Sequence, residues 1–90
     1  MSTSTPDADG EERLSETEFR DRLRELPPSA KLVAKVLEGD APLSQGQLAD
    51  ESLLPDRTVR YALNRLEESG LVGSRYSFKD ARKQVYYLNQ

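Results

Sequence analysis

Five side chains suited to recognising nucleic acid are gathered in one short segment, at Arg57, Arg60, Tyr61, Asn64 and Arg65. A guanidinium can hold a guanine edge or a phosphate through two parallel hydrogen bonds, and an amide side chain can pair with an adenine edge. The chain has no His and no Cys, which removes the commonest general base, a thiol nucleophile and the ordinary zinc ligands. We therefore expect binding chemistry, with no enzyme activity, cofactor or metal.

The segment 56–69 that carries these side chains has the pattern of an amphipathic helix. At about 100° per residue, Val59, Leu63 and Leu66 share one sector with Ala62 beside them. The opposite side is polar and carries Arg57, Tyr61, Asn64 and Glu68, with Arg60 and Arg65 on the two shoulders. Basic residues at a helix N-terminus oppose the helix dipole, so this distribution favours an external polyanion. Adjacent helical positions diverge too far for Glu67 and Glu68 to flank one substrate bond.

Charge is unevenly distributed along the chain. The net charge is −3, yet residues 57–90 hold seven bases against three acids, and residues 1–28 hold eight acids against four arginines. The local field decides which partner is attracted. Nine Arg against four Lys, with many acids, is a compositional hint of a salt-loving source.

Residues 1–14 are polar and acidic without apolar periodicity, so we expect a disordered tail. Ser15 and Glu18 form a capping-box pattern for a helix that ends before Pro27-Pro28. Its apolar stripe, Phe19, Leu23 and Leu26, can pack on the domain or meet its copy in a second chain.

Two further helices are expected before residue 56. Residues 29–40 place Leu32, Val33, Val36 and Leu37 on one face, with Gly39 as the C-terminal stop. After a brief extended piece at 41–43, Ser44 and Gln47 open a short helix. Residues 52–55 form the turn into the 56–69 helix, which Gly70 ends.

Beyond Gly70 the pattern changes to β-branched and aromatic residues in segments 71–78 and 83–90, which predicts a β-hairpin. We expect Tyr76, Phe78, Tyr86 and Tyr87 to pack in the sheet and core. The predicted fold is mainly α with a small hairpin (α+β), in the order helix, helix, strand, helix, helix, strand, strand, as one domain over 15–90.

Leu48-Ala49, Leu54, Thr58-Val59, Leu63, Leu66 and Gly70-Leu71-Val72 together resemble the winged helix-turn-helix domain of MarR-like transcription regulators, particularly archaeal ones. The resemblance covers about 27–88. It implies that 57–65 belongs to the recognition helix, that 44–53 forms the supporting helix and turn, and that the hairpin is the wing. Leu53 departs from the Gly that many relatives have in the turn, and Pro55 replaces the usual Ser or Asp cap.

The expected partner is double-stranded DNA, with the recognition helix at about 56–69 in the major groove and the wing at about 73–86 on the flanking backbone. Candidates for base edges are Arg57, Thr58, Arg60, Tyr61 and Asn64. Candidates for phosphates are Ser44, Gln45, Gln47, Arg65, Arg75, Lys79, Arg82 and Lys83.

A homodimer is expected, because one helix in one groove gives little contact for specific binding. The resemblance implies a C-terminal dimerisation helix that we do not expect here, so Phe19, Leu23 and Leu26 are the candidate dimer contact. The alternative function is a winged-helix adaptor that binds protein and no DNA, which the acidic N-terminal segment favours slightly. With no apolar run of about 18 residues and no signal-peptide pattern, we expect a cytoplasmic protein without a membrane segment. A small-molecule effector is undetermined.

Overall fold

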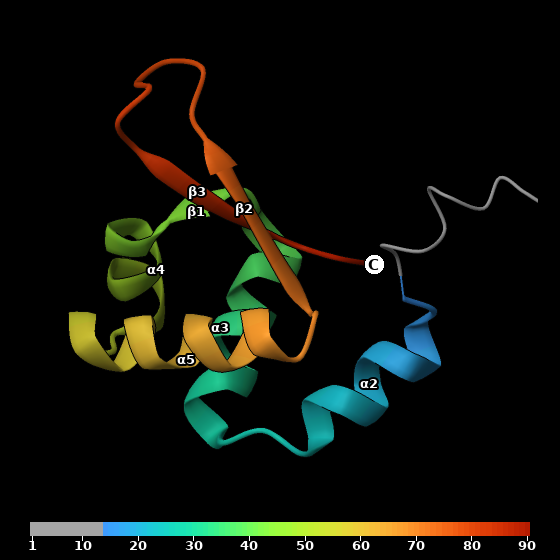
Figure 1. The fold of residues 1–90 in the computed structure, drawn as a ribbon. Coiled ribbons are helices and arrows are strands. Elements are labelled where there is room, and N and C mark those ends of the chain that lie inside the picture. Colours follow the sequence, from blue (N-terminus) through green and yellow to red (C-terminus); the bar gives the residue numbers. More distant parts are fainter. Residues whose placement is uncertain (1–13) are drawn as a thin grey trace, which may run out of the picture.

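The computed structural model describes residues 14–90, so the predicted tail lies, apart from Leu14, outside the described residues. Four helices and three strands follow one another in the predicted order (Figure 1). They are α2 (Glu16–Arg24), α3 (Pro28–Asp40), β1 (Leu43–Ser44), α4 (Gln45–Ser52), α5 (Asp56–Glu68), β2 (Val72–Tyr76) and β3 (Gln84–Leu88). The predicted fold class is confirmed. None of these helices is long and apolar enough to cross a membrane.

The core lies where α3, α4 and α5 meet one face of the sheet. The predicted inner face of α5 is confirmed, since Val59, Ala62, Leu63 and Leu66 are all buried. They pack in one cluster with Leu48 of α4 and with Leu71, which follows α5. This packing fixes the rotation of α5 about its axis, and so decides which side chains face solvent.

The predicted face of α3 was wrong in part. Leu32 is 40% exposed and Val36 is half-buried, whereas the buried positions are Ala30, Val33, Ala34 and Leu37. These four follow the i, i+3, i+4, i+7 spacing of one helical face. The two alanines bring little side-chain volume, which allows close packing on α5. Gly39 was also misplaced, because it lies inside α3, which continues to Asp40.

The helix ends follow local rules of capping. Both predicted capping boxes form: Ser15 Oγ accepts the Glu18 N–H at 3.1 Å, and Ser44 Oγ accepts the Gln47 N–H at 3.2 Å. Pro55 caps α5 without a side-chain hydrogen bond, and Asp56 occupies the first turn. At the other end Gly70 has φ 75°, the left-handed conformation that glycine adopts readily. The Leu71 N–H donates to the Leu66 carbonyl at 2.9 Å, which completes the glycine stop.

Leu53 adopts the conformation that a glycine would take in the turn between α4 and α5. Its φ is 64° and ψ 23°, so the turn keeps its left-handed residue although this residue is Leu in place of Gly. The side chain is 88% exposed and gains little from packing in return. A Cβ in the left-handed region costs about 1–2 kcal/mol.

We predict that Leu53→Gly raises the free energy of unfolding by about 0.5–1 kcal/mol, because the relief of strain exceeds the extra chain entropy of glycine. Thermal or urea unfolding measures the change. Leu53→Ala is the matched control, since it keeps the Cβ and should bring no gain. Equal stability of Leu53→Gly and Leu53→Ala would show that the turn is unstrained.

The sheet is antiparallel with the order β1-β3-β2. In β2 and β3, Val72 lies opposite Leu88 and Ser74 opposite Tyr86 on the core-facing side, whereas Gly73 lies opposite Tyr87 on the other side. A Cβ at Gly73 would come within 2.8 Å of the outer end of the Tyr87 ring, so any larger residue there would require this ring to shift. Beyond β1 the two-stranded hairpin projects from the body (Figure 1).

The prediction that all four aromatic residues of this region pack inside was wrong for two of them. Tyr86 and Tyr87 are half-buried, but Tyr76 is 63% exposed and Phe78 is 99% exposed. Tyr76 ends β2 and Phe78 lies beyond it, so neither has a layer of helices beneath it.

The apolar side chains predicted as a stripe, Phe19, Leu23 and Leu26, pack on the domain of the same chain. Phe19 and Leu26 are buried in the common core, and Leu23 is partly buried against it. Arg22 also holds α2 in place, since its Nη1 donates to the Ser69 carbonyl at 2.9 Å, at the C-terminal end of α5. Of the two roles considered for the stripe, packing on the domain is the one that Phe19 and Leu26 fulfil.

Candidate nucleic-acid interface

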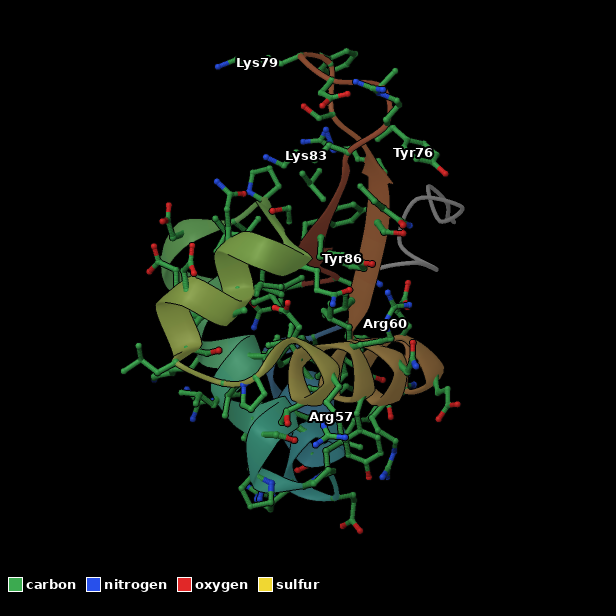
Figure 2. All side chains as sticks on the ribbon, turned by 90° about the vertical axis from the view of Figure 1, so that its left-hand side faces the viewer. Arg57, Arg60, Tyr76, Lys79, Lys83 and Tyr86 are labelled. Carbon is green, nitrogen blue, oxygen red and sulfur yellow. The ribbon has the colours of Figure 1, made fainter. Side chains whose placement is uncertain are left out.

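The outer face of α5 carries the predicted recognition side chains. Arg57, Arg60, Tyr61 and Asn64 are exposed, while Thr58 is half-buried at the edge of the core. Figure 2 views the molecule from the side of the α5 N-terminus, with Arg57 and Arg60 on this helix. Within residues 14–90, ion pairs form at Arg20, Arg24, Lys35 and Arg82, so neither Arg57 nor Arg60 is neutralised by a carboxylate. As far as residues 14–90 are concerned, both guanidiniums are exposed to an external anion.

Arg65 is placed differently from the other two arginines of α5. It is half-buried, its Nη1 donates to the Tyr61 hydroxyl at 2.9 Å, and its guanidinium carbon lies 5.9 Å from the centre of the Tyr61 ring. The two residues are one helical turn apart, the spacing at which helical side chains meet. Arg65 and Tyr61 thus form a pair on the helix surface, which orders both side chains.

A groove of about 540 Å³ lies between α4 and the hairpin, with Arg60 of α5 on its border. Its lining includes three cations, Arg60, Arg82 and Lys83, against one carboxylate, Asp50. Three different elements supply these charges, so the groove is cationic only in the folded chain. Such a concave basic surface suits a phosphate backbone.

The N-terminus of α4 borders this groove, but its three predicted phosphate contacts all make hydrogen bonds within the chain. Ser44 is buried and its hydroxyl accepts the Gln47 N–H, while the Gln47 side-chain carbonyl accepts the Ser44 N–H at 2.9 Å. Gln45 Nε2 donates to the Asp56 carbonyl at 3.3 Å, which links the first turns of α4 and α5. Phosphate contacts by these three residues stay a prediction. The hydrogen bonds that they make within the chain hold this wall of the groove in place.

The hairpin contributes four exposed cations: Arg75, Lys79, Arg82 and Lys83. In Figure 2 Lys79 marks the far end of the hairpin, and Lys83 lies closer to the body. Asp80, the carboxylate among them, accepts the Arg82 backbone N–H at 3.0 Å and lies 3.7 Å from the Arg82 Nε. The net charge of the hairpin end, with four cations against one carboxylate, is positive.

Tyr86 connects the hairpin to α5. Burial raises the pKa of its phenol above the ordinary 10.0; the Glu67 carboxylate adds to the rise and the Arg60 guanidinium opposes it. Because Arg60 and Glu67 lie about two helical turns apart on one side of α5, the phenol sits over that side. Figure 2 shows Tyr86 between Arg60 and Lys83.

This placement gives an alkaline pH dependence of stability. The folded chain favours the neutral phenol of Tyr86. The contribution of this phenol to the free energy of unfolding is therefore fully present below the ordinary pKa of 10.0, and it is lost as the pH rises through the higher pKa of the folded state. We expect Tyr86→Phe to flatten the fall of unfolding free energy with pH in that range, measured by urea unfolding at a series of pH values. Tyr87→Phe is the matched control and should keep the fall; identical profiles for both variants would contradict this assignment.

Three residues with a part in the site were not identified from the sequence. Arg22 and Asn89 hold the end of α5, Asn89 through its Nδ2, which donates to the Gly70 carbonyl at 3.1 Å. Tyr86 was expected only to pack. No local pattern marks these contacts, because the partners lie 19 or more positions away in the chain.

Residues 34–72, from the middle of α3 to the start of β2, match the family model described as winged helix-turn-helix DNA-binding. The fold is a winged helix-turn-helix. In this winged helix α4 and α5 are the two helices of the helix-turn-helix, and the β2–β3 hairpin is the wing. No curated protein matches the chain.

Solved structures of transcription regulators have the same winged helix. Transcriptional regulator PA4135 is 26% identical with a TM-score of 0.65, over 80% of this chain and 54% of that one. The MarR family transcription regulator SP03579 is 19% identical with a TM-score of 0.68, over 80% and 48%. MepR of S. aureus, solved as a DNA complex, is 18% identical with a TM-score of 0.66, over 81% and 62%. The winged helix described here thus spans about half the length of these proteins.

Proposed function

We propose that this chain is a transcription regulator that binds double-stranded DNA, with α5 in the major groove and the wing on the flanking backbone. The observation that carries the proposal is the pair Arg57 and Arg60: both are exposed on the outer face of α5, and no carboxylate in residues 14–90 pairs with either. An arginine at the start of a recognition helix can read guanine through two hydrogen bonds.

The surroundings of α5 support the same proposal. The groove beside it is lined by Arg60, Arg82 and Lys83, which suits the phosphates on one side of the major groove. Tyr61 is paired with Arg65 and, like Asn64, is exposed on the outer face of α5. The family model that matches residues 34–72 is a DNA-binding one, and the MepR structure of the same fold contains DNA.

The proposal includes a homodimer, because two recognition helices are needed for the contact area of a specific complex. Phe19 and Leu26 are already buried within the chain, so a dimer contact on α2 would use Leu23 and the exposed side of that helix. We also propose a cytoplasmic, archaeal-type regulator that acts without cofactor or covalent chemistry, in agreement with the sequence resemblance.

The salt dependence of duplex binding tests this function. Each phosphate contact releases counterions, so the logarithm of the association constant should fall linearly with the logarithm of the salt concentration. Fluorescence anisotropy with a labelled duplex measures the slope. Reversal of Arg82 and Lys83 together, as R82E/K83E, should weaken binding to every duplex and reduce the slope.

The adaptor alternative gives a different result in the same experiment. A protein-binding winged helix would show no saturable binding to duplex DNA even at low salt. The matched control is K31E/K35E on α3, which makes the same change in net charge outside the groove. Equal loss of binding in both double variants would show that only the overall charge matters.

A further inference from the structure

Phe78 at the end of the wing has no role in the packing of residues 14–90. It is 99% exposed, so its ring forgoes the burial that normally stabilises an aromatic side chain. The neighbouring exposed aromatic, Tyr76, still belongs to β2, whereas Phe78 lies in the loop between the two strands. An apolar ring in this position is open to contact by a partner from beyond residues 14–90.

Hydrogen bonds within the loop hold its backbone in shape. The Ser77 N–H donates to the Lys83 carbonyl and the Lys83 N–H to the Asp80 carbonyl, both at 2.8 Å. The Lys79 N–H donates to Ser77 Oγ at 3.2 Å. Phe78 thus lies between two residues whose backbones are held by hydrogen bonds. Because this loop is already ordered, binding of a partner to it costs little conformational entropy.

The charge around Phe78 selects the class of partner. Lys79, Arg82 and Lys83 are exposed in the same loop or at its end, and Asp80 is occupied by Arg82. A second copy of this loop would bring like charges together. A nucleic acid satisfies both features, because it presents phosphates to the cations and stacked bases to the ring.

We propose that Phe78 is an apolar wedge that enters the minor groove next to the site of α5 and leans between two adjacent base pairs, with Lys79 and Arg82 on the flanking phosphates. This inference rests on the proposed function and extends it from backbone contact to deformation of the DNA. Apolar wedges of this kind partly unstack a base step and bend the duplex by about 20–90°. Flexible pyrimidine–purine steps should therefore be favoured under the wing.

The experiment compares wild type with Phe78→Ala on a duplex selected for binding, with 2-aminopurine under the wing and a dye pair at the two ends. Wild type should raise the 2-aminopurine fluorescence and bring the ends closer together. Phe78→Ala should lose both signals and bind roughly 5-fold to 100-fold more weakly, the loss of one base–aromatic contact. Tyr76→Ala removes the other exposed aromatic of the hairpin and should behave as wild type.

Several outcomes overturn the inference. If wild type binds the duplex with the expected salt slope but Phe78→Ala retains both signals and the affinity, the wedge is excluded while the proposed function stands. If Phe78→Ala changes only the sedimentation of the free protein, or only its binding to vesicles of phosphatidylglycerol, the ring contacts protein or lipid instead. Absence of any duplex binding by wild type removes the function and the wedge together.

Discussion

Arg57→Ala and Arg60→Ala should each weaken binding to a selected duplex by about 1–3 kcal/mol. Both guanidiniums lie exposed on the outer face of α5, and within the described chain neither pairs with an acid. Their removal therefore costs contacts with DNA and little folding stability. Fluorescence anisotropy on the selected duplex and on a scrambled one measures the effect, which should be larger on the selected duplex.

Arg24→Ala is the matched control for these variants, since it removes one exposed arginine from α2, where the guanidinium is bonded to Asp21 at 3.0 Å. Its affinity for either duplex should stay within a factor of about two, because a surface ion pair is worth about 0–1 kcal/mol. If all three variants bind the selected duplex equally well, base reading by Arg57 and Arg60 is excluded.

The second large effect concerns the support of α5. Leu66→Ala should lower the free energy of unfolding by about 2–5 kcal/mol, because Leu66 is fully buried in the cluster that joins α5 to α3 and α4. In a small domain with total stability of about 5–15 kcal/mol, this is a large fraction of the whole. Urea unfolding followed by circular dichroism gives the change as a lower midpoint at an unchanged slope.

Leu32→Ala serves as the control for Leu66→Ala, since it deletes the same atoms from a side chain that is 40% exposed on α3. The cost there should be clearly smaller, because part of the side chain is already in contact with water. Equal costs at the two positions would contradict the observed orientation of α3, on which the placement of α5 depends.

The parts of the fold that the sequence predicted depend on local rules. Val59, Leu63 and Leu66 were identified by periodicity, Ser15 and Ser44 by their capping boxes, and Gly70 by its place after the last apolar residue of α5. Each of these patterns reports an interaction within a few residues along the chain, so it can be read without knowledge of the neighbours in space.

The parts that could not be predicted depend on distant residues or on strain. Ala30 and Ala34 are buried because α3 packs closely on α5, and their small side chains gave no apolar signal. Leu53 adopts a left-handed backbone conformation that its residue type disfavours, so its sequence position gave no indication of this conformation. Phe78 is exposed because the hairpin extends past the helices, which the β-propensity of an aromatic residue cannot reveal.

The candidate site also has parts that the sequence predicted and parts that depend on residues far apart in the chain. The cationic face of α5 was predicted, since the buried side of a helix determines its exposed side. The groove shared by Arg60, Arg82 and Lys83 needs the antiparallel register of β2 and β3, which brings Tyr86 and the hairpin cations to the same groove as Arg60. The capping roles of Ser44 and Gln47 were predicted from the local pattern, whereas the hydrogen bond from Gln45 to the Asp56 carbonyl became visible only in the structure.

Selection of bound sequences from a random pool of duplex DNA tests the central claim most directly, that the outward arginines of α5 read base edges. The account predicts that wild type enriches one motif containing guanine, and that Arg57→Ala or Arg60→Ala relaxes the preference at a single position of it. Enrichment of no motif by wild type, at any salt concentration that permits binding, would contradict it.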